Sequence, residues 1–165
     1  MQRPQLEHII RATSGITGTD RFVVIGSQAV LGQFPNPPAE LLVSIEADLF
    51  SLRNPSDAEL IDGSIGEGSP FHQTFGCYAH GVAEETAVLP LHNQNTGGGT
   101  GLCLEVHDLA VSKLVAGREK DMDYVGALFR HRLARTTVVE ERLGVTPLAS
   151  DRRELCFARL RRCSK

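Results

Sequence analysis

Arg21-Phe22-Val23-Val24-Ile25-Gly26-Ser27 carries the strongest strand signal in the chain. Its middle is an unbroken run of aromatic and β-branched residues, which is typical of a strand buried on both faces. The Gly-Ser pair that follows predicts a turn, and residues 28–32 have the composition of a short helix. The backbone N–H groups of such a turn can bind phosphate oxygens. We therefore expect a buried strand that ends in a turn able to hold a phosphate group.

A second strand is predicted about twenty residues later, over residues 41–50. In its second half apolar and polar residues alternate, which places Glu46 and Asp48 on one face. Strand residues two apart lie roughly 6–7 Å from each other on that face, and two carboxylates at this spacing can share divalent metal ions. A turn for phosphates and a platform for metal ions together favour metal-assisted phosphoryl or nucleotidyl transfer. A solvated strand face beside an ordinary turn is the alternative.

Short elements are predicted for the rest of the N-terminal part. Residues 4–13 show helical spacing of their apolar side chains, and Ser56 with Glu59 has the signature of a capping box at the start of a helix over residues 56–63. Strand-like runs at residues 71–82 and 86–90 predict a hairpin. The glycine-rich residues 92–101 predict a flexible loop, and a last short strand is predicted at residues 102–106.

From Asp108 onward the apolar spacing becomes helical. Asp108 is predicted to cap a helix that ends at Gly117, and three more helices are expected at residues 119–131, 137–143 and 150–163. Strands followed by helices indicate an α/β fold of the α+β kind, with a small mixed β-sheet and a helical C-terminal half. We expect one domain over residues 1–165, with a sheet-containing core at 1–106 and a helical part at 107–165.

Composition agrees with a globular domain and argues against several classes of protein. The chain has 165 residues, 41% of them hydrophobic, and a net charge of −3, which argues against a general nucleic-acid or anionic-membrane coat. Its apolar runs are far shorter than the roughly 18 residues of a membrane span, and its first residues lack the apolar core of a secretory leader. Four scattered cysteines without a CxxC pair fit thiols in a reducing compartment. We therefore expect a cytoplasmic protein with no membrane partner.

Two motifs resemble the polymerase-β-type nucleotidyltransferase superfamily, and two later segments resemble a group of small bacterial members of it. Residues 23–32 (VVIGSQAVLG) resemble its opening Gly-Gly/Ser motif, and residues 44–49 (SIEADL) resemble its acid-x-acid strand. Residues 108–114 (DLAVSKL) and 117–123 (GREKDMD) resemble a later Asp-Leu-x-x-x-Lys-Leu helix and an Arg-x-Lys-Asp stretch. This last pair is similar to small bacterial proteins related to the AbiEii toxins of abortive-infection toxin–antitoxin systems. The resemblance covers roughly residues 20–130.

The resemblance implies a nucleotidyltransferase fold and a role for each matching residue. Gly26 and Ser27 would contact the phosphates of a nucleoside triphosphate (NTP), and Glu46 and Asp48 would hold Mg²⁺ or Mn²⁺. Four further residues would line the far side of a cleft and bind the nucleotide: Asp108, Lys113, Lys120 and Asp121. Of these, Lys113 would also be catalytic, together with Glu46 and Asp48. The implied reaction moves a nucleoside monophosphate from the NTP to a hydroxyl on RNA, protein or a small molecule, while metal ions activate the hydroxyl and stabilise the pyrophosphate.

The sequence departs from the superfamily pattern in two places. Glu46 stands where the first acid of the pair is usually Asp. Active members also have a third carboxylate on a neighbouring strand, whereas the matching strand here reads Tyr78-Ala79-His80-Gly81. Glu84 and Glu85 lie just beyond that strand, and His80 could serve as a base. The alternative is therefore that the chain is a catalytically degenerate nucleotidyltransferase-fold protein. It would bind a nucleotide or a protein, and the bound protein could be an antitoxin-like partner.

Other chemical signals have simpler explanations. Lys113 can be a helix-surface lysine, and residues 118–123 can be a charged helix start. The glycine-rich residues 96–101 lack the Gly-Lys-Ser/Thr ending of a phosphate loop, so a disordered connector is the simpler interpretation. Zinc-dependent hydrolysis would need histidines at HxH or HxxxH spacing, and Cys77 has no neighbour that would lower the pKa of its thiol. The histidines considered for zinc are His72, His80, His92 and His107.

Overall fold

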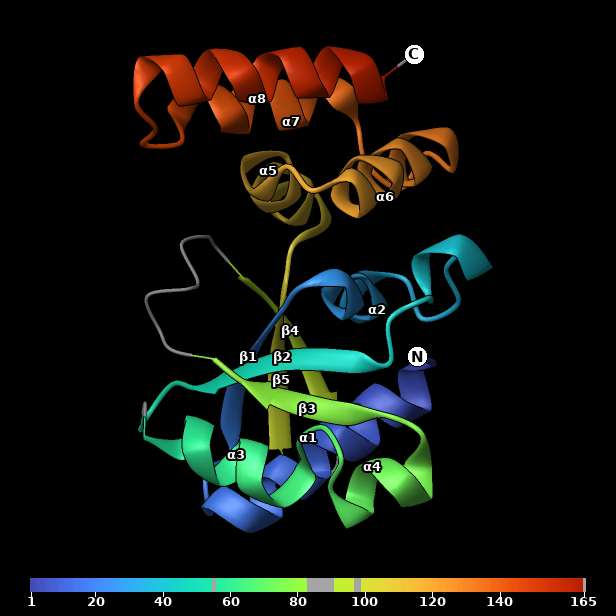
Figure 1. Cartoon of the computed structure of the whole chain (residues 1–165), viewed down its shortest axis with the longest axis vertical. Helices are drawn as coiled ribbons and strands as arrows, with labels where there is room; N and C mark the ends of the chain where they lie inside the picture. The colour runs from blue at the N-terminus through green and yellow to red at the C-terminus, as the bar shows by residue number, and fades with distance from the viewer. Residues whose placement is uncertain (55, 83–90, 97–98, 165) are drawn as a thin grey trace. The chain divides into compact units, whose positions relative to one another are not determined.

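The computed structural model describes residues 1–54, 56–82, 91–96 (backbone only) and 99–164. The chain divides into two compact units, Met1–Glu105 and Val106–Lys165, and each is described by itself. Strands occur in the first unit, whereas the described elements of the second are helices (Figure 1). The predicted α+β class, with a small mixed sheet and a helical C-terminal part, is confirmed.

Five strands form one mixed sheet in the order β3-β2-β1-β5-β4. The central strand β1 pairs in antiparallel fashion with β2 and in parallel with β5, while β3 runs parallel to β2 and β4 antiparallel to β5. The bounds of the strands are β1 Arg21–Ile25, β2 Glu46–Ser51, β3 Tyr78–Gly81, β4 Leu91–Thr96 and β5 Gly99–Leu104.

The buried strand predicted at residues 21–25 is β1. Phe22, Val23 and Val24 are completely buried, because β1 has a strand on each side and helices over the sheet. Burial of side chains of this size stabilises the fold by about 1.5–3 kcal/mol each. The register of β1 with β2 places Ile25 opposite Asp48, so the turn after β1 lies beside the predicted acidic pair.

Helices lie on both sides of this sheet, with α1, α3 and α4 below it and α2 above it in Figure 1. Helix α1 packs against α3 and β5, and α3 packs against β2 and β3. The elements are α1 Arg3–Thr17, the 3-10 turn η1 Ser27–Ala29, α2 Val30–Gln33, the 3-10 turn η2 Ala39–Leu41, α3 Asp57–Ile65 and α4 Pro70–Phe75. The helices predicted near residues 4–13, 28–32 and 56–63 are thus confirmed, although Ser56 makes no side-chain capping hydrogen bond.

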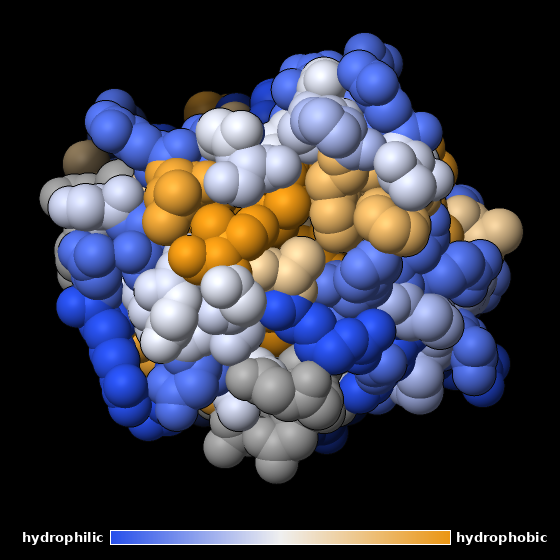
Figure 2. Space-filling model, turned by 90° about the horizontal axis from the view of Figure 1, so that it is seen from below, coloured by the Kyte–Doolittle hydropathy of each residue, from blue (hydrophilic) through white to orange (hydrophobic). Residues whose placement is uncertain are grey.

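The underside of this unit carries an apolar patch, which Figure 2 shows as an orange area. Leu60 of α3 and Phe75 of α4 are 46% and 44% exposed. The rings of Phe71, Phe75 and His8 also lie together, with centroids 4.3–5.1 Å apart. The contacts of His8 with both phenylalanines link α1 to α4.

The prediction of a strand at residues 71–75 is wrong, because this segment is helix α4. Pro70 occupies the first turn, where its missing N–H costs nothing. The Ser69 side chain accepts a hydrogen bond from the backbone N–H of His72, and Gly76 ends the helix in the left-handed conformation (φ 66°). The strand begins only at Tyr78, and among the described residues it pairs with β2. The other arm of that hairpin, residues 86–90, lies outside the described residues.

Two other strand predictions are also corrected. Residues 92–101, predicted to be a flexible loop, lie largely in the described strands β4 (Leu91–Thr96) and β5 (Gly99–Leu104), which pair in antiparallel fashion, and the strand predicted at 102–106 is the second half of β5. Their Asn-, Thr- and Gly-rich sequence has low strand propensity, so the pairing of β5 with β1 overrides local preference. The strand predicted from residue 41 begins only at Glu46, since η2 occupies residues 39–41 and Val43 is 80% exposed.

The second unit is built from α5 Val106–Ala116, α6 Glu119–Arg130, α7 Thr136–Val145 and α8 Ser150–Cys163. Helix α5 packs against the other three, and the buried side chains include Leu109, Leu128, Leu143 and Leu160. The four predicted helices are confirmed, except that α5 begins at Val106, so Asp108 lies in its first turn rather than at its cap. No described helix combines the length and the apolar character needed to cross a membrane.

Charge is divided unequally between the two units. Residues 1–105 contain four Lys or Arg and twelve Asp or Glu, a net charge of −8, whereas residues 106–165 contain thirteen and eight, a net charge of +5. The overall charge of −3 is therefore the difference between two larger charges of opposite sign.

Gly81, at the end of β3, should be intolerant of a side chain. A Cβ there would collide with the backbone of Ala58 in α3, and backbone cannot move aside as a flexible side chain can. We expect Gly81→Ala to lower the free energy of unfolding by about 1–3 kcal/mol, the usual cost of overpacking. Urea denaturation followed by circular dichroism measures this change.

Gly63→Ala is the matched control for that substitution. Gly63 lies within α3, and a Cβ there meets no atom within 4 Å. Alanine in a helix interior should raise stability by roughly 0.5–1 kcal/mol. Equal effects of the two substitutions would contradict the close packing of β3 on α3.

Candidate functional site

Side chains of β2 and β3 form a cluster of potential metal ligands. In the parallel register Asp48 lies opposite His80, and Glu46 lies two residues before Asp48 on the same face. His80 Nδ1 is 3.1 Å from Asp48 Oδ1 and 3.4 Å from Glu46 Oε1. One ligand atom from each residue lies within 4.8 Å of the others, and among the described residues this is the one such group of three.

The cluster is open to solvent. The side chains of Glu46, Asp48 and His80 are 38%, 29% and 50% exposed. Their partial exposure leaves room for an incoming ligand, and Asp48 lies next to the turn that follows β1. Exposure of this kind suits a binding site better than a buried structural ion pair.

The glycine of the Gly-Ser turn packs directly against this cluster. Gly26 adopts φ +68°, a conformation that residues with a side chain rarely adopt. A Cβ at this position would also collide with the Asp48 carboxylate. Two independent constraints therefore require glycine, and the structure places the glycine of the predicted turn against Asp48 of the predicted acidic pair.

Gln28, in the 3-10 turn η1, is a polar residue that sequence reasoning missed. Its side chain is almost completely buried (1% exposed), and within the described part of the chain neither its Nε2 nor its Oε1 has a hydrogen-bond partner. An unsatisfied buried amide costs about 1–3 kcal/mol. The signal available in the sequence was only a polar residue directly after the turn, which does not reveal burial.

The donor atoms of the cluster fit a divalent metal ion. Carboxylate oxygens are the ligands that Mg²⁺ and Mn²⁺ prefer, and the side chain of Asp48 is still 29% exposed. Glu46 reaches the cluster although it stands where the superfamily pattern that the motifs resemble usually has Asp. The third donor is an imidazole nitrogen, which the resemblance to nucleotidyltransferases did not lead us to expect.

A third carboxylate does not join Glu46 and Asp48 among the residues that the structure describes. His80 occupies the place on the neighbouring strand where that acid was sought. The nearby Asp62 instead accepts a hydrogen bond from the backbone N–H of Gly81 (2.7 Å). Glu84 and Glu85, the other candidates, lie outside the described residues.

No family model, curated protein or solved structure matches this chain. The resemblance to nucleotidyltransferases consequently rests on the sequence motifs alone.

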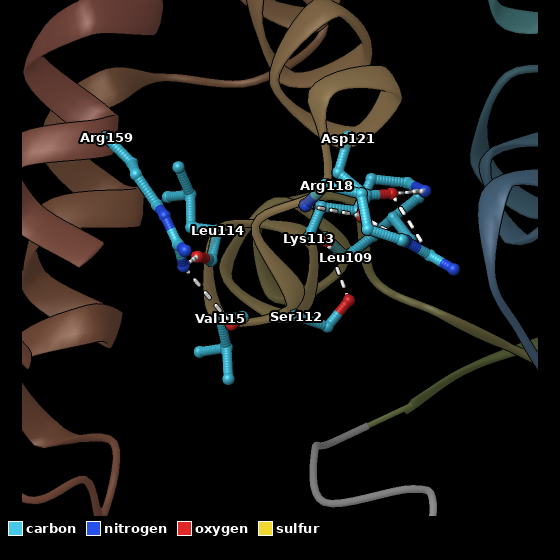
Figure 3. A network of polar contacts seen from close by, with 8 residues as sticks. All are labelled: Leu109, Ser112, Lys113, Leu114, Val115, Arg118, Asp121 and Arg159. Atoms are coloured by element: carbon cyan, nitrogen blue, oxygen red, sulfur yellow. Dashed lines mark hydrogen bonds and ion pairs between the residues drawn. The ribbon is translucent and has the colours of Figure 1, made fainter. Parts of the chain in front are cut away.

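The other predicted site residues lie in the helical unit, where most of them are buried and paired. Lys113 Nζ is 3.3 Å from Asp121 Oδ1 and 4.5 Å from the centroid of the Tyr124 ring. Arg118 donates from Nε to Asp121 Oδ2 at 2.7 Å and from a terminal nitrogen to Oδ1 at 3.2 Å. Figure 3 shows Lys113 and Arg118 converging on Asp121. This network links the end of α5 to the start of α6.

Burial and charge act in opposite directions on this network. Burial would raise the pKa of Asp121, but hydrogen bonds from Arg118 and the charge of Lys113 outweigh it and hold the pKa below its ordinary value of 3.8. Burial lowers the pKa of Lys113, although the Asp121 carboxylate opposes this shift. The pair is stable because each charge has a partner at hydrogen-bonding distance.

Asp108 and Lys120 differ in their surroundings. Asp108 is buried and pairs with Arg142 of α7 at 2.6 Å, whereas Lys120 lies exposed in the first turn of α6. The contacts of Asp108, Lys113 and Asp121 join helices within this unit. Their role opposite a nucleotide stays a prediction.

The histidines considered for zinc lie in different places. The imidazole of His72 accepts the N–H of Gly68, and that of His107 accepts the N–H of Arg135. His80 is the one that joins a cluster of potential ligands within the described residues, and the side chain of His92 lies outside them. Burial raises the pKa of the Cys77 thiol, which disfavours the thiolate needed for nucleophilic attack.

Asp121→Asn tests whether this carboxylate stabilises the helical unit. Removal of its charge takes the paired carboxylate away from the buried Lys113, which should lower the free energy of unfolding by about 3 kcal/mol at pH 7. The lowered pKa of Asp121 means that its contribution is complete above pH 3.8 and is lost as the pH falls through the lowered value. The difference from wild type in urea denaturation should therefore shrink in acid.

Asp123→Asn on the same helix provides the control. Asp123 is exposed, so its loss should change stability by no more than about 0.5 kcal/mol. A comparable loss in both variants would show that helix charge, rather than the buried pair, is responsible.

Proposed function

We propose that this chain transfers a nucleoside monophosphate from an NTP to a hydroxyl acceptor, at a divalent metal ion held by Glu46 and Asp48. The observation that carries the proposal is the position of Gly26 directly against the Asp48 carboxylate. It places a turn, whose backbone N–H groups could contact phosphate, beside two carboxylates suited to a metal ion.

Each residue of the cluster has a defined part in this proposal. Glu46 and Asp48 hold the ion from adjacent positions on one face of β2, and backbone N–H groups at Gly26 and Ser27 contact the phosphates. Helix α2 spans only Val30–Gln33, so the turn itself, rather than a helix dipole, provides this contact. A bound Mg²⁺ or Mn²⁺ would neutralise charge on the transferred phosphoryl group and on the leaving pyrophosphate.

A second candidate function is a nucleotide-binding or protein-binding module that does not transfer the nucleotide. One observation favours it: the place where active nucleotidyltransferases have a third carboxylate holds His80. Such a chain would keep the metal and phosphate contacts and act with an antitoxin-like partner. If the chain is instead the nucleotidyltransferase proposed first, its acceptor is RNA, a protein or a small molecule, and its activity can be toxin-like.

A reducing cytoplasm is the compartment that we propose. All four cysteines are free thiols, and Cys77, Cys103 and Cys156 are buried. Burial raises the pKa of Cys103 to about 12, so that thiol is protonated and unreactive at neutral pH.

Calorimetric titration of ATP, GTP, CTP and UTP in the presence of Mg²⁺ tests the proposal. We expect the full-length chain to bind at least one of them in a metal-dependent way. The double substitution Glu46→Ala with Asp48→Ala should abolish this binding, because it removes both carboxylate ligands. Failure of all four nucleotides to bind would overturn the proposal.

A charge-matched variant separates a loss of ligands from a loss of charge. Glu59→Ala with Glu67→Ala removes two exposed carboxylates from the same unit and leaves the cluster intact. It should bind nucleotide as wild type does. If the variant Glu46→Ala with Asp48→Ala still binds nucleotide, the chain can only be a binding module whose nucleotide site lies elsewhere.

A further inference from the structure

We infer that His80 is a third ligand of the metal site and that it makes the site select a first-row transition-metal ion over Mg²⁺. The inference rests on the proposed function in taking the cluster of Glu46, Asp48 and His80 as the place where metal binds. It goes further in naming the third donor and the class of ion.

The spacing of the three donors fits a single ion. Metal–ligand distances of about 2.0–2.2 Å place neighbouring ligand atoms roughly 3–4.4 Å apart. His80 Nδ1 lies 3.1 Å from Asp48 Oδ1 and 3.4 Å from Glu46 Oε1, and all three ligand atoms fall within 4.8 Å. One ion could therefore contact both carboxylates and the imidazole with small side-chain movements.

The backbone around His80 is held in place. The N–H of Tyr78 donates to the carbonyl of Ile45, and the N–H of Val82 donates to the carbonyl of Leu49. Gly81 fits closely against Ala58 of α3 and donates to the Asp62 carboxylate. These contacts fix β3 beside β2 on both sides of His80, so the imidazole begins from a defined position.

The orientation of Asp48 is constrained as well. Its Oδ2 lies against Gly26, while its Oδ1 is the atom that approaches His80. The carboxylate therefore spans the space between the turn and the imidazole. The position of the Asp48 carboxylate follows from the positive φ of Gly26 and from the register of β1 with β2, and not from its contact with His80.

The chemistry of the donor set determines which ion is favoured. Mg²⁺ prefers oxygen ligands in strict octahedral geometry and retains several waters. Imidazole nitrogen suits zinc and other transition metals, and affinity for a site with nitrogen ligands rises from Mn²⁺ toward Zn²⁺. Two carboxylates and one imidazole are therefore expected to bind Zn²⁺ more tightly than Mn²⁺, and Mn²⁺ more tightly than Mg²⁺.

Calorimetry on the metal-stripped, full-length chain tests this order with Zn²⁺, Mn²⁺ and Mg²⁺ as the probes. We expect one strong site per chain, with Zn²⁺ bound at least a hundredfold more tightly than Mg²⁺. His80→Ala should weaken Zn²⁺ binding at least tenfold and change Mg²⁺ binding less than about threefold. His80→Asp should weaken Zn²⁺ binding and strengthen Mg²⁺ binding, because it supplies oxygen in place of nitrogen.

His72→Ala is the matched control. It removes a histidine of the same unit whose ring contacts Gly68 and Tyr78 rather than the cluster, so it should leave the affinity for all three ions unchanged. Circular dichroism of each variant establishes that it is folded. Equal affinity of wild type for the three ions, or unchanged Zn²⁺ affinity in His80→Ala, overturns the inference and leaves His80 as an ion-pair partner of the carboxylates.

Nucleotide titrations distinguish this inference from the proposed function. If the chain binds Zn²⁺ through His80 but binds no nucleotide with any of the three ions, the metal inference stands and the nucleotidyltransferase proposal fails. If nucleotide binds equally well with Mg²⁺ in wild type and His80→Ala, and Zn²⁺ affinity does not depend on His80, the function stands and the inference fails.

Discussion

The burial of β1 between β2 and β5 is the constraint on which the rest of the first unit depends. Phe22, Val23 and Val24 are fully buried, and a strand so apolar has no other stable place than the middle of a sheet. Once β1 is central, its antiparallel register with β2 brings Asp48 opposite Ile25. The turn at Gly26 must then pass beside the carboxylate. The candidate site is thus a consequence of core packing together with one glycine.

Sequence patterns predicted those parts of the fold that depend on local periodicity. The β1 run, the alternation around Glu46 and Asp48, and the helices that became α6 and α8 all have their cause within a few neighbouring residues. Strands β4 and β5 behaved differently, because their structure comes from the pairing of β5 with β1 and of β4 with β5 and not from their own propensity. Helix α4 was missed because Phe71, Phe75 and Cys77 are residue types that are common in strands. The capping signal at Ser69 lies before that run, and the helix-ending signal at Gly76 lies within it.

Some residues of the candidate site could likewise be found from local sequence patterns, whereas others could not. Glu46, Asp48 and Gly26 could be found from sequence, since each is part of a recognisable strand or turn. His80 was noted as a residue on the matching strand, but its distance from Asp48 depends on the parallel register of β3 with β2, which no local pattern encodes. Lys113 and Asp121 illustrate the opposite problem: residue types suited to a triphosphate are also suited to a buried ion pair, and only burial distinguishes the two.

The unequal division of charge has a consequence for the order in which ligands can arrive. The sheet-containing unit carries a net charge of −8, and Glu46 and Asp48 place two of its negative charges at the cluster itself. At physiological ionic strength such charges act over about 8 Å, so a phosphate group near Gly26 would be repelled by both carboxylates. A divalent cation at the cluster reverses that local field. Any anionic ligand of this site should therefore follow the cation or arrive already bound to it.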